Sequence, residues 1–411
     1  MKRHAKKSTP LQKIFLVVDV GIILIGLVAL YYLFMPDVQS TASSSSVESA
    51  ESTSQRETET SSTVETSTSK QSDTLDAANY ENLIQNQEVV APSGQTLDEK
   101  ITSSGFIGSA LIVQDGQILL HKGYGYTDKE INVLNTPDTV YNIGSIQKGM
   151  TAVLIMRAVK EGKLSLTDRL AKFYPQIQGA KDVTIQEMLQ MASGLKLSAQ
   201  PSGLVDVRQI IDWDVVHTQV TGAKGQFQYS PVNYNLLAGI LIQVTGKTYD
   251  ELFSTFYNQK MGLKQTLSYT DFFQLPTPTR NYKTDGKEDA YETPNIISSD
   301  NLASEIGTGN IYMSVGDLYQ YYHLLLNNKL IDGASLKKMW TTAEGSSYAA
   351  GVYDRGTYYR AHGAKGGFES FALLSKDKKT SIILLSNRAR KSDADLMSRL
   401  YKTLTNTEIK F

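Results

Sequence analysis

The 411-residue chain contains no cysteine. This absence excludes disulfide bonds, zinc–thiolate sites and cysteine nucleophiles, and it suits a secreted protein that does not rely on oxidative folding. The chain also lacks an excess of charge of either sign, because its formal net charge is −1. A strong basic surplus is typical of proteins that bind nucleic acid, so the composition gives no reason to expect such a partner.

Large apolar side chains are almost missing from 36–76, a stretch rich in Ser, Thr and Glu. Such a segment cannot bury a core, so we predict a disordered linker there. Before it, 14–35 is almost wholly apolar apart from Asp19, and 1–13 is basic. About twenty apolar residues span a bilayer core, and a basic flank stays in the cytoplasm. We therefore predict a cytoplasmic tail, a transmembrane anchor (14–35), a linker and an extracellular domain (77–411).

A cleaved signal peptide is the alternative to a retained anchor. Its apolar core is shorter, and it ends in a small-x-small cleavage site. Here the apolar run ends in Tyr31-Tyr32-Leu33-Phe34-Met35-Pro36, which is typical of a membrane interface. The pattern favours an anchor that stays attached.

Strand patterns occur at both ends of 77–411, and helical patterns occupy its middle. An Asp115-Gly116 turn between two apolar runs indicates a hairpin, and Thr184 is a candidate helix cap. This order predicts an α/β domain into which a helical domain is inserted. The predicted strands are 106–113, 117–123, 349–354, 357–361, 367–375 and 380–386, and the clearest predicted helices are 146–160, the one that follows Thr184, and 393–404.

Ser145 lies where a short extended run meets the helix predicted over 146–160, and Lys148 follows three residues later. On a helix these two side chains share a face. A serine hydroxyl is a poor nucleophile, but a neighbouring amine with a lowered pKa can take its proton. The alternative is that Ser145 caps the helix and Lys148 is a solvated surface charge.

Several sequence blocks, in order, resemble the serine β-lactamase and penicillin-binding-protein superfamily, and most closely its class C and esterase branch. This resemblance implies an antiparallel sheet flanked by helices, with an inserted all-helical domain. It also implies that Ser145 and Lys148 form the Ser-x-x-Lys motif of penicillin-recognising enzymes. The matching blocks are 142–148, 164–168, 184–195, 225–230, 234–240 with 245–247, 307–314 with 317–318, and 362–368.

The second motif of that superfamily is Tyr-x-Asn, and here it is Tyr229-Ser230-Pro231. The resemblance implies that Tyr229 moves protons to and from the nucleophile. In the family the asparagine contacts the substrate amide, a contact that proline cannot make because it has no side-chain donor or acceptor. Asn233 is the nearby residue that could replace it. The alternative for Tyr229 is a core aromatic with its hydroxyl hydrogen-bonded.

The third motif is Lys-Thr-Gly or His-x-Gly on a strand beside the serine, and it matches His362-Gly363-Ala364. The resemblance implies an oxyanion hole made by the backbone N–H groups of Ser145 and Lys365. The alternative is an ordinary strand with a surface histidine. No spacing of residues suggests a metal site or a cofactor.

These features lead us to expect a membrane-anchored extracellular serine hydrolase that forms an acyl-enzyme. Its substrate would be a D-alanylated envelope polymer, and we rank D-alanyl esters of teichoic or lipoteichoic acid first. The alternatives are a D,D-carboxypeptidase on peptidoglycan stem peptides and a β-lactamase. A hypothesis of another class is a catalytically idle wall-binding or penicillin-sensing domain. We expect a monomer whose other partner is the lipid bilayer.

The anchor hypothesis predicts that the full-length protein fractionates with membranes, because 14–35 is long and apolar enough to span one. Protease added outside whole cells should remove the domain that follows the linker. Full-length protein in the cytosol, or a mature N-terminus beyond Met35 on most molecules, would contradict a retained anchor.

Overall fold

A computed structural model describes residues 87–221, 224–283, 291 and 293–411. The predicted tail, anchor and linker (1–76) lie outside these residues. The chain divides into two units between Gln71 and Ser72, and the described residues all belong to the second. Among their helices, none is both long and apolar enough to cross a membrane.

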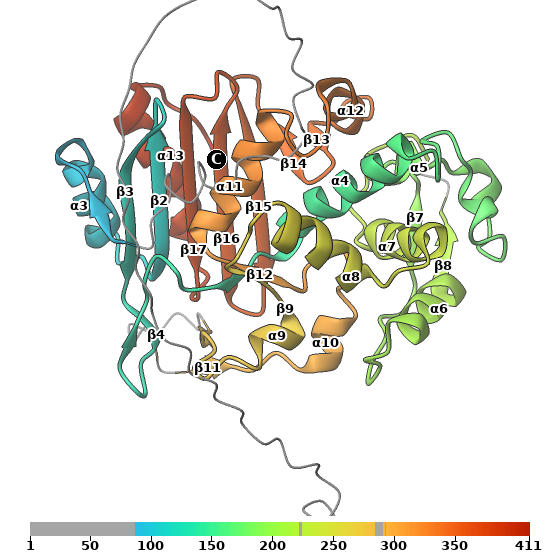
Figure 1. The fold of residues 1–411 in the computed structure, drawn as a ribbon, viewed down its shortest axis with the longest axis horizontal. Helices are drawn as coiled ribbons and strands as arrows, with labels where there is room; N and C mark the ends of the chain where they lie inside the picture. The colour runs from blue at the N-terminus through green and yellow to red at the C-terminus, as the bar shows by residue number, and fades with distance from the viewer. Residues whose placement is uncertain (1–86, 222–223, 284–290, 292) are drawn as a thin grey trace, which may run out of the picture. The chain divides into compact units, whose positions relative to one another are not determined.

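An antiparallel sheet forms the centre of the described residues (Figure 1). Its eight strands lie in the order β1-β3-β2-β17-β16-β15-β14-β13. Because β2 pairs with β17, the first and last parts of the domain share one sheet, as the strand patterns at both ends predict. The strands are β1 (Val89–Val90), β2 (Gly108–Gln114), β3 (Gln117–Tyr124), β13 (Tyr348–Ala349), β14 (Val352–Asp354), β15 (Tyr358–Lys365), β16 (Phe368–Ser375) and β17 (Thr380–Ser386).

Tight turns connect the strands at both ends of the sheet. The predicted hairpin turn between β2 and β3 is confirmed, with positive φ at Asp115 and Gly116. The single strand predicted over 349–354 is wrong. Ala350 and Gly351 have φ of 44° and 98°, and their turn splits this segment into β13 and β14. The strand predicted over 357–361 continues to Lys365, so it includes the third motif.

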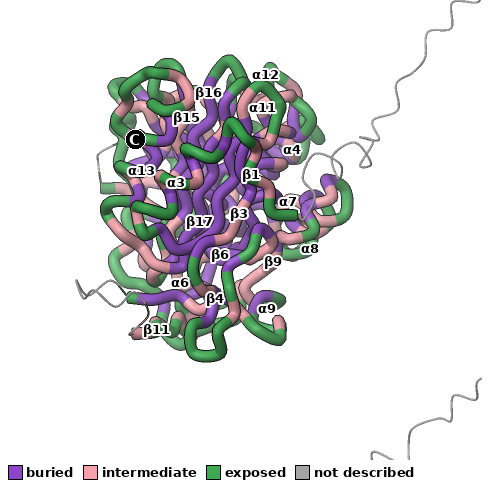
Figure 2. The backbone as a smooth tube through the Cα atoms, turned by 90° about the vertical axis from the view of Figure 1, so that its left-hand side faces the viewer, coloured by how far each residue is buried: buried purple, intermediate pink, exposed green. Residues whose placement is uncertain are grey.

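Helices cover both faces of the sheet. One face packs against α3 (Gln95–Ser103) and α13 (Lys391–Thr405), and the latter agrees with the helix predicted over 393–404. The other face packs against α11 (Val315–Leu326) and the helical region. Figure 2 shows the strands buried between these layers. The strands therefore alternate between two apolar surroundings rather than between core and solvent.

The helical region follows the first strands, as predicted, and a small two-stranded antiparallel sheet interrupts it. Thr184 begins its second helix with a capping box completed by Glu187. The helices are α4 (Gln147–Lys160), α5 (Ile185–Leu189), α6 (Val207–His217), α7 (Val232–Thr245) and α8 (Tyr249–Phe253), and the small sheet pairs β7 (Leu195–Leu197) with β8 (Thr218–Val220).

Smaller elements complete the fold. They are η1 (Pro92–Gly94), β4 (Tyr126–Asp128), β5 (Val133–Leu134), β6 (Tyr141–Asn142), η2 (Gly144–Ile146), η3 (Leu170–Lys172), η4 (Ala180–Asp182), the π-helical η5 (Ser254–Lys260), β9 (Thr266–Ser268), α9 (Tyr269–Phe272), β10 (Asn281–Tyr282), β11 (Pro294–Asn295), α10 (Ser299–Ala303), β12 (Ile311–Met313) and α12 (Gly333–Met339).

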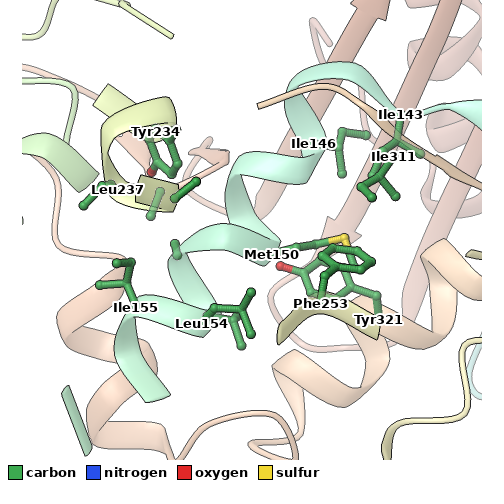
Figure 3. Close-up of a cluster of buried hydrophobic side chains, with 14 of the residues drawn as sticks. Ile143, Ile146, Met150, Leu154, Ile155, Tyr234, Leu237, Phe253, Ile311 and Tyr321 are labelled. Carbon is green, nitrogen blue, oxygen red and sulfur yellow. The ribbon is translucent and has the colours of Figure 1, made fainter. Parts of the chain in front are cut away.

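Helix α4 is buried along most of its length (Figure 3). Its Met150 and Leu154 lie near Phe253 and Tyr321 on one side, and Tyr234 of α7 lies on another. A helix held on several sides has one position and one rotation, because a shift would open cavities in a close-packed core. This packing fixes the turn that precedes α4, where Ser145 lies.

Candidate active site

Ser145 is the middle residue of the η2 turn between β6 and α4. The turn begins with Gly144, whose φ of +49° is unusual for a residue with a side chain. The side chain of Asn142 braces it, because its Oδ1 accepts a hydrogen bond from the N–H of Gly144 at 2.8 Å. Neither η2 nor α4 has a side-chain cap. The capping alternative for Ser145 is therefore wrong.

Two side chains meet the hydroxyl of Ser145. Lys148 Nζ lies 3.0 Å from Ser145 Oγ, and the Tyr229 hydroxyl donates to the same oxygen at 2.6 Å. Lys148 is 1% exposed, so it is not the solvated surface charge of the alternative prediction. Tyr229 is 40% exposed, so it is not the core aromatic residue of the alternative prediction. Its hydroxyl nevertheless points to Ser145.

Burial changes the acid–base properties of both groups. It lowers the pKa of Lys148 to about 8, because a charged ammonium loses its hydration there. It raises the pKa of Tyr229 to about 12. A neutral Lys148 amine can accept the proton of Ser145, and a protonated Tyr229 phenol can donate one to a leaving oxygen. The trio can therefore activate a nucleophile and protonate a leaving group without a histidine.

An acidic residue that sequence reasoning missed lies behind Lys148. Lys148 Nζ donates to the backbone oxygen of Thr308 at 3.0 Å, and the Thr308 hydroxyl donates to Glu305 at 2.7 Å. The other carboxylate oxygen of Glu305 accepts from Lys365 Nζ at 2.6 Å. Burial alone would raise the pKa of Glu305, but Lys365 and Lys148 hold it below its usual value. The available signal was an acidic residue two positions before the matching block that begins at Gly307.

The segment that carries Thr308 is tied to the start of α4. Gln147 is fully buried, its Oε1 accepts from the N–H of Asn310 at 2.7 Å, and its Nε2 donates to Asn310 Oδ1 at 2.9 Å. Asn142 Nδ2 donates to the Gly309 oxygen at 3.0 Å. The residues on either side of the serine turn therefore hold the loop that supports Lys148.

Strand β15 lies directly against the serine turn. A Cβ atom on Gly363 would lie 2.0 Å from the oxygen of Ile143 and 2.9 Å from the nitrogen of Ser145. Any side chain at this position would push the strand away from the nucleophile. The lack of a side chain at Gly363 therefore lets β15 lie against the serine turn.

The register of β15 corrects the expected oxyanion donor. Backbone groups of a strand alternate in direction, and the oxygen of Tyr358 faces β14, where it accepts from Arg355. The backbone N–H and C=O groups of every second residue of β15, counted from Tyr358, point to this same side of the strand. Ala364 is one of these residues. The backbone groups of Lys365 point to the other side, and Lys365 pairs with Phe368 across the β15–β16 hairpin. The N–H of Ala364, not that of Lys365, faces the open edge of the strand beside Ser145.

His362 lies at the cavity but outside the Ser145 network. Its ring stacks on Phe371 with centroids 5.0 Å apart, and its Nε2 lies 2.9 Å from Glu369 Oε1. The structure shows no hydrogen bond from this ring to Ser145 or Lys148. His362 can meet a bound substrate, but it is not placed to exchange a proton with the nucleophile.

Asn233 does not replace the missing motif asparagine, so this expectation is wrong. It is fully buried in α7, its Oδ1 accepts from the Ser193 hydroxyl at 2.6 Å, and its Nδ2 donates to the Ser230 oxygen at 2.9 Å. Pro231 is exposed and precedes the helix with φ −55° and ψ −33°. Neither position offers the site an amide side chain.

A cavity of about 260 Å³ opens over the nucleophile. Gly363 and Ala364 form one wall. The rest of its lining includes Ser145, Tyr229, Tyr348, Tyr353, Arg360 and His362. Sequence reasoning missed the tyrosines of β13 and β14 and Arg360, because on strands these residue types are typical of ordinary sheet packing. Within the described residues, no group of three or more His, Asp or Glu side chains is arranged to hold a metal ion.

Comparison with known proteins identifies relatives of this architecture. The family model described as Beta-lactamase matches residues 95–405. The putative penicillin-binding protein PbpX of Bacillus subtilis (strain 168) is 30% identical over 293 residues, which cover 71% of this chain and 73% of that protein. A teichoic acid D-alanine hydrolase of Staphylococcus aureus is 26% identical over 320 residues, which cover 74% of this chain and 79% of that protein.

Solved structures show the same fold. The crystal structure of FmtA from Staphylococcus aureus has a TM-score of 0.69 at 23% identity and covers 84% of this chain and 98% of that chain. A D-amino acid amidase from Ochrobactrum anthropi SV3 has a TM-score of 0.63 at 19% identity, and the match covers 76% of this chain and 99% of that chain. At these identities the likeness concerns the fold alone.

Because Glu305 and Lys365 carry opposite charges near Lys148, removing one or the other should shift the pH profile of kcat/KM in opposite directions. Hydrolysis needs the neutral amine, so kcat/KM should rise with pH through about 8. Glu305 raises the pKa of Lys148 and Lys365 lowers it. Glu305→Gln should therefore move the rise to lower pH, and Lys365→Met should move it to higher pH.

The matched control is Glu161→Gln, which removes an exposed carboxylate just beyond the other end of α4. Its profile should coincide with that of the wild type. Shifts of the same sign in the Glu305 and Lys365 variants would show that these charges do not act on Lys148.

Proposed function

Because the chain belongs to the Beta-lactamase family, we propose that this serine hydrolase releases D-alanine from D-alanyl esters of teichoic acids. The observation that carries the proposal is the contact of Ser145 Oγ with both Lys148 and Tyr229 at the floor of an open cavity. The 26% identical relative named as a teichoic acid D-alanine hydrolase supports this substrate class.

In the proposed reaction the neutral amine of Lys148 takes the proton of Ser145 while Oγ attacks the ester carbonyl carbon. The N–H groups of Ser145 and Ala364 stabilise the negative oxygen of the tetrahedral intermediate. Tyr229 donates its proton to the leaving alcohol oxygen, and Lys148 returns a proton to Tyr229. Water then attacks the D-alanyl-enzyme by the same route in reverse and releases D-alanine.

The altered second motif supports an ester rather than an amide substrate. Pro231 has no amide to offer, and the amide of Asn233 is used inside the protein. A missing hydrogen bond to a bound amide weakens its binding by about 0.5–1.5 kcal/mol. An ester lacks the N–H group of an amide and is also the easier acyl donor.

A D,D-carboxypeptidase is the second candidate. It is favoured by the 30% identity to a protein named as a putative penicillin-binding protein. An idle wall-binding or sensing domain would keep the fold without the chemistry. The closeness of Ser145, Lys148 and Tyr229 argues against it, because an idle site has no need to bury an amine beside a serine.

The proposed location is the outer face of the cell membrane. The apolar run 14–35 would hold the protein there, and the polar linker 36–76 would let the domain reach polymers between membrane and wall. We propose that it acts there as a monomer.

The test of this function is D-alanine release by the full-length protein from purified D-alanylated lipoteichoic acid and, separately, from a pentapeptide muropeptide. We expect faster release from the polymer. Ser145→Ala should abolish release, because it removes the nucleophile, and it should leave the melting temperature close to that of the wild type. Equal or faster release from the peptide would place the carboxypeptidase first.

Pro231→Asn tests whether the second motif sets this preference. The exposed position and a φ of −55° are compatible with asparagine, so the variant should fold. A recovered amide contact should raise kcat/KM on the peptide, and the rate of acylation by penicillin, by about two- to tenfold. Unchanged rates on both would show that Pro231 does not determine specificity.

A further inference from the structure

Arg360 is a charged residue of the cavity that the proposed reaction does not use. It lies on β15, three residues before Gly363, and it lines the same cavity as Ser145. Three residues of a strand span about 10 Å, so its long side chain can contact a substrate held at the serine. A group bound by Arg360 would belong to the part of the substrate just beyond the reacting ester.

Among the described residues, no hydrogen bond or ion pair neutralises the guanidinium of Arg360 at close range. Its Nε is buried and forms no hydrogen bond. Glu369, on the neighbouring strand, is hydrogen-bonded to His362, and its charge acts on Arg360 only from a greater distance. A partly buried cation without a directly paired counter-charge is costly, and it would be stabilised by an anion that enters the cavity.

Aromatic rings hold this guanidinium in place. Its Cζ lies 4.7 Å from the ring centroid of Phe411 and 5.6 Å from that of Tyr353. Such cation–π contacts orient the planar group without using its N–H donors. A guanidinium fixed in this way is prepared for two parallel hydrogen bonds to the oxygens of a phosphate or a carboxylate.

No acidic residue is among those that line the cavity. Glu305, the acidic residue near Lys148, is paired with Lys365. The charges that line the cavity therefore favour an anionic substrate group at Arg360.

We propose that Arg360 is a specificity-determining residue that binds an anionic oxygen group of the substrate, namely the phosphodiester next to the D-alanyl ester in a polyol-phosphate polymer. This inference rests on the proposed function. The same chemistry fits a second source, the terminal carboxylate of a peptide. In a glycerol-phosphate chain the phosphate lies only a few bonds from the ester oxygen, so serine and arginine can engage one repeat together.

The test compares two small substrates with the full-length protein: the D-alanyl ester of glycerol, and the same ester carrying a phosphodiester on the neighbouring carbon. The wild type should have a kcat/KM about ten- to a hundredfold higher on the phosphorylated ester, the usual effect of a charge-assisted hydrogen-bond pair. Arg360→Gln should remove most of this ratio. Arg360→Lys should restore part of it, because it keeps the charge but not the two parallel donors.

Arg355→Gln is the matched control, because it removes an exposed arginine close to the cavity but outside its lining. Its ratio should equal that of the wild type. An equal loss on both esters in Arg360→Gln would indicate a structural role and overturn the proposal, and so would a wild-type ratio near one.

A third arm separates the two sources of the anion. D-alanyl-D-alanine peptides are compared with a free carboxylate and with an amidated C-terminus. A carboxylate preference that Arg360→Gln abolishes, without a phosphodiester preference, would overturn the phosphodiester in favour of the peptide. Failure of the wild type on every D-alanyl ester, with hydrolysis of an activated nitrophenyl ester intact, would reject the proposed function itself.

Discussion

The buried amine of Lys148 is the constraint on which the rest of the site depends. A lysine that is 1% exposed remains beside a serine only if the surrounding structure supplies polar partners. Those partners come from segments far apart in sequence: Ser145 on the preceding turn, the backbone oxygen of Thr308, and Glu305 behind it. Burial then lowers the pKa of the amine far enough for it to act as a base near neutral pH.

Strand β15 joins Ser145, Lys148 and Tyr229 to the cavity. Gly363 allows the strand to touch the serine turn, and the N–H of the next residue, Ala364, then faces Ser145. The side chain of Lys365 reaches Glu305 at one end, and Arg360 reaches the cavity at the other. Because alternate residues of a strand point in opposite directions, one register determines all of these placements together.

Much of the fold was predictable, because its signals are local. Apolar periodicity and the Asp115-Gly116 turn indicated the first hairpin, and Thr184 indicated the start of α5. Lys148 was predictable as the neighbour of Ser145, because three residues on a helix bring side chains to one face. Tyr229 followed only from the resemblance to a family motif, since nothing in its own surroundings marks it as catalytic.

The sequence by itself determined the order of strands and helices, the pairing of Ser145 with Lys148, and the absence of an amide side chain at Pro231. Only the tertiary structure decided that the Asn233 side chain is hydrogen-bonded within the protein, that the N–H of Ala364 rather than that of Lys365 faces Ser145, and that Glu305 lies behind Lys148. The reason is geometric. Spacing along one helix or turn is fixed by backbone dimensions, whereas a one-residue change of strand register or helix rotation turns a side chain from the site into the core.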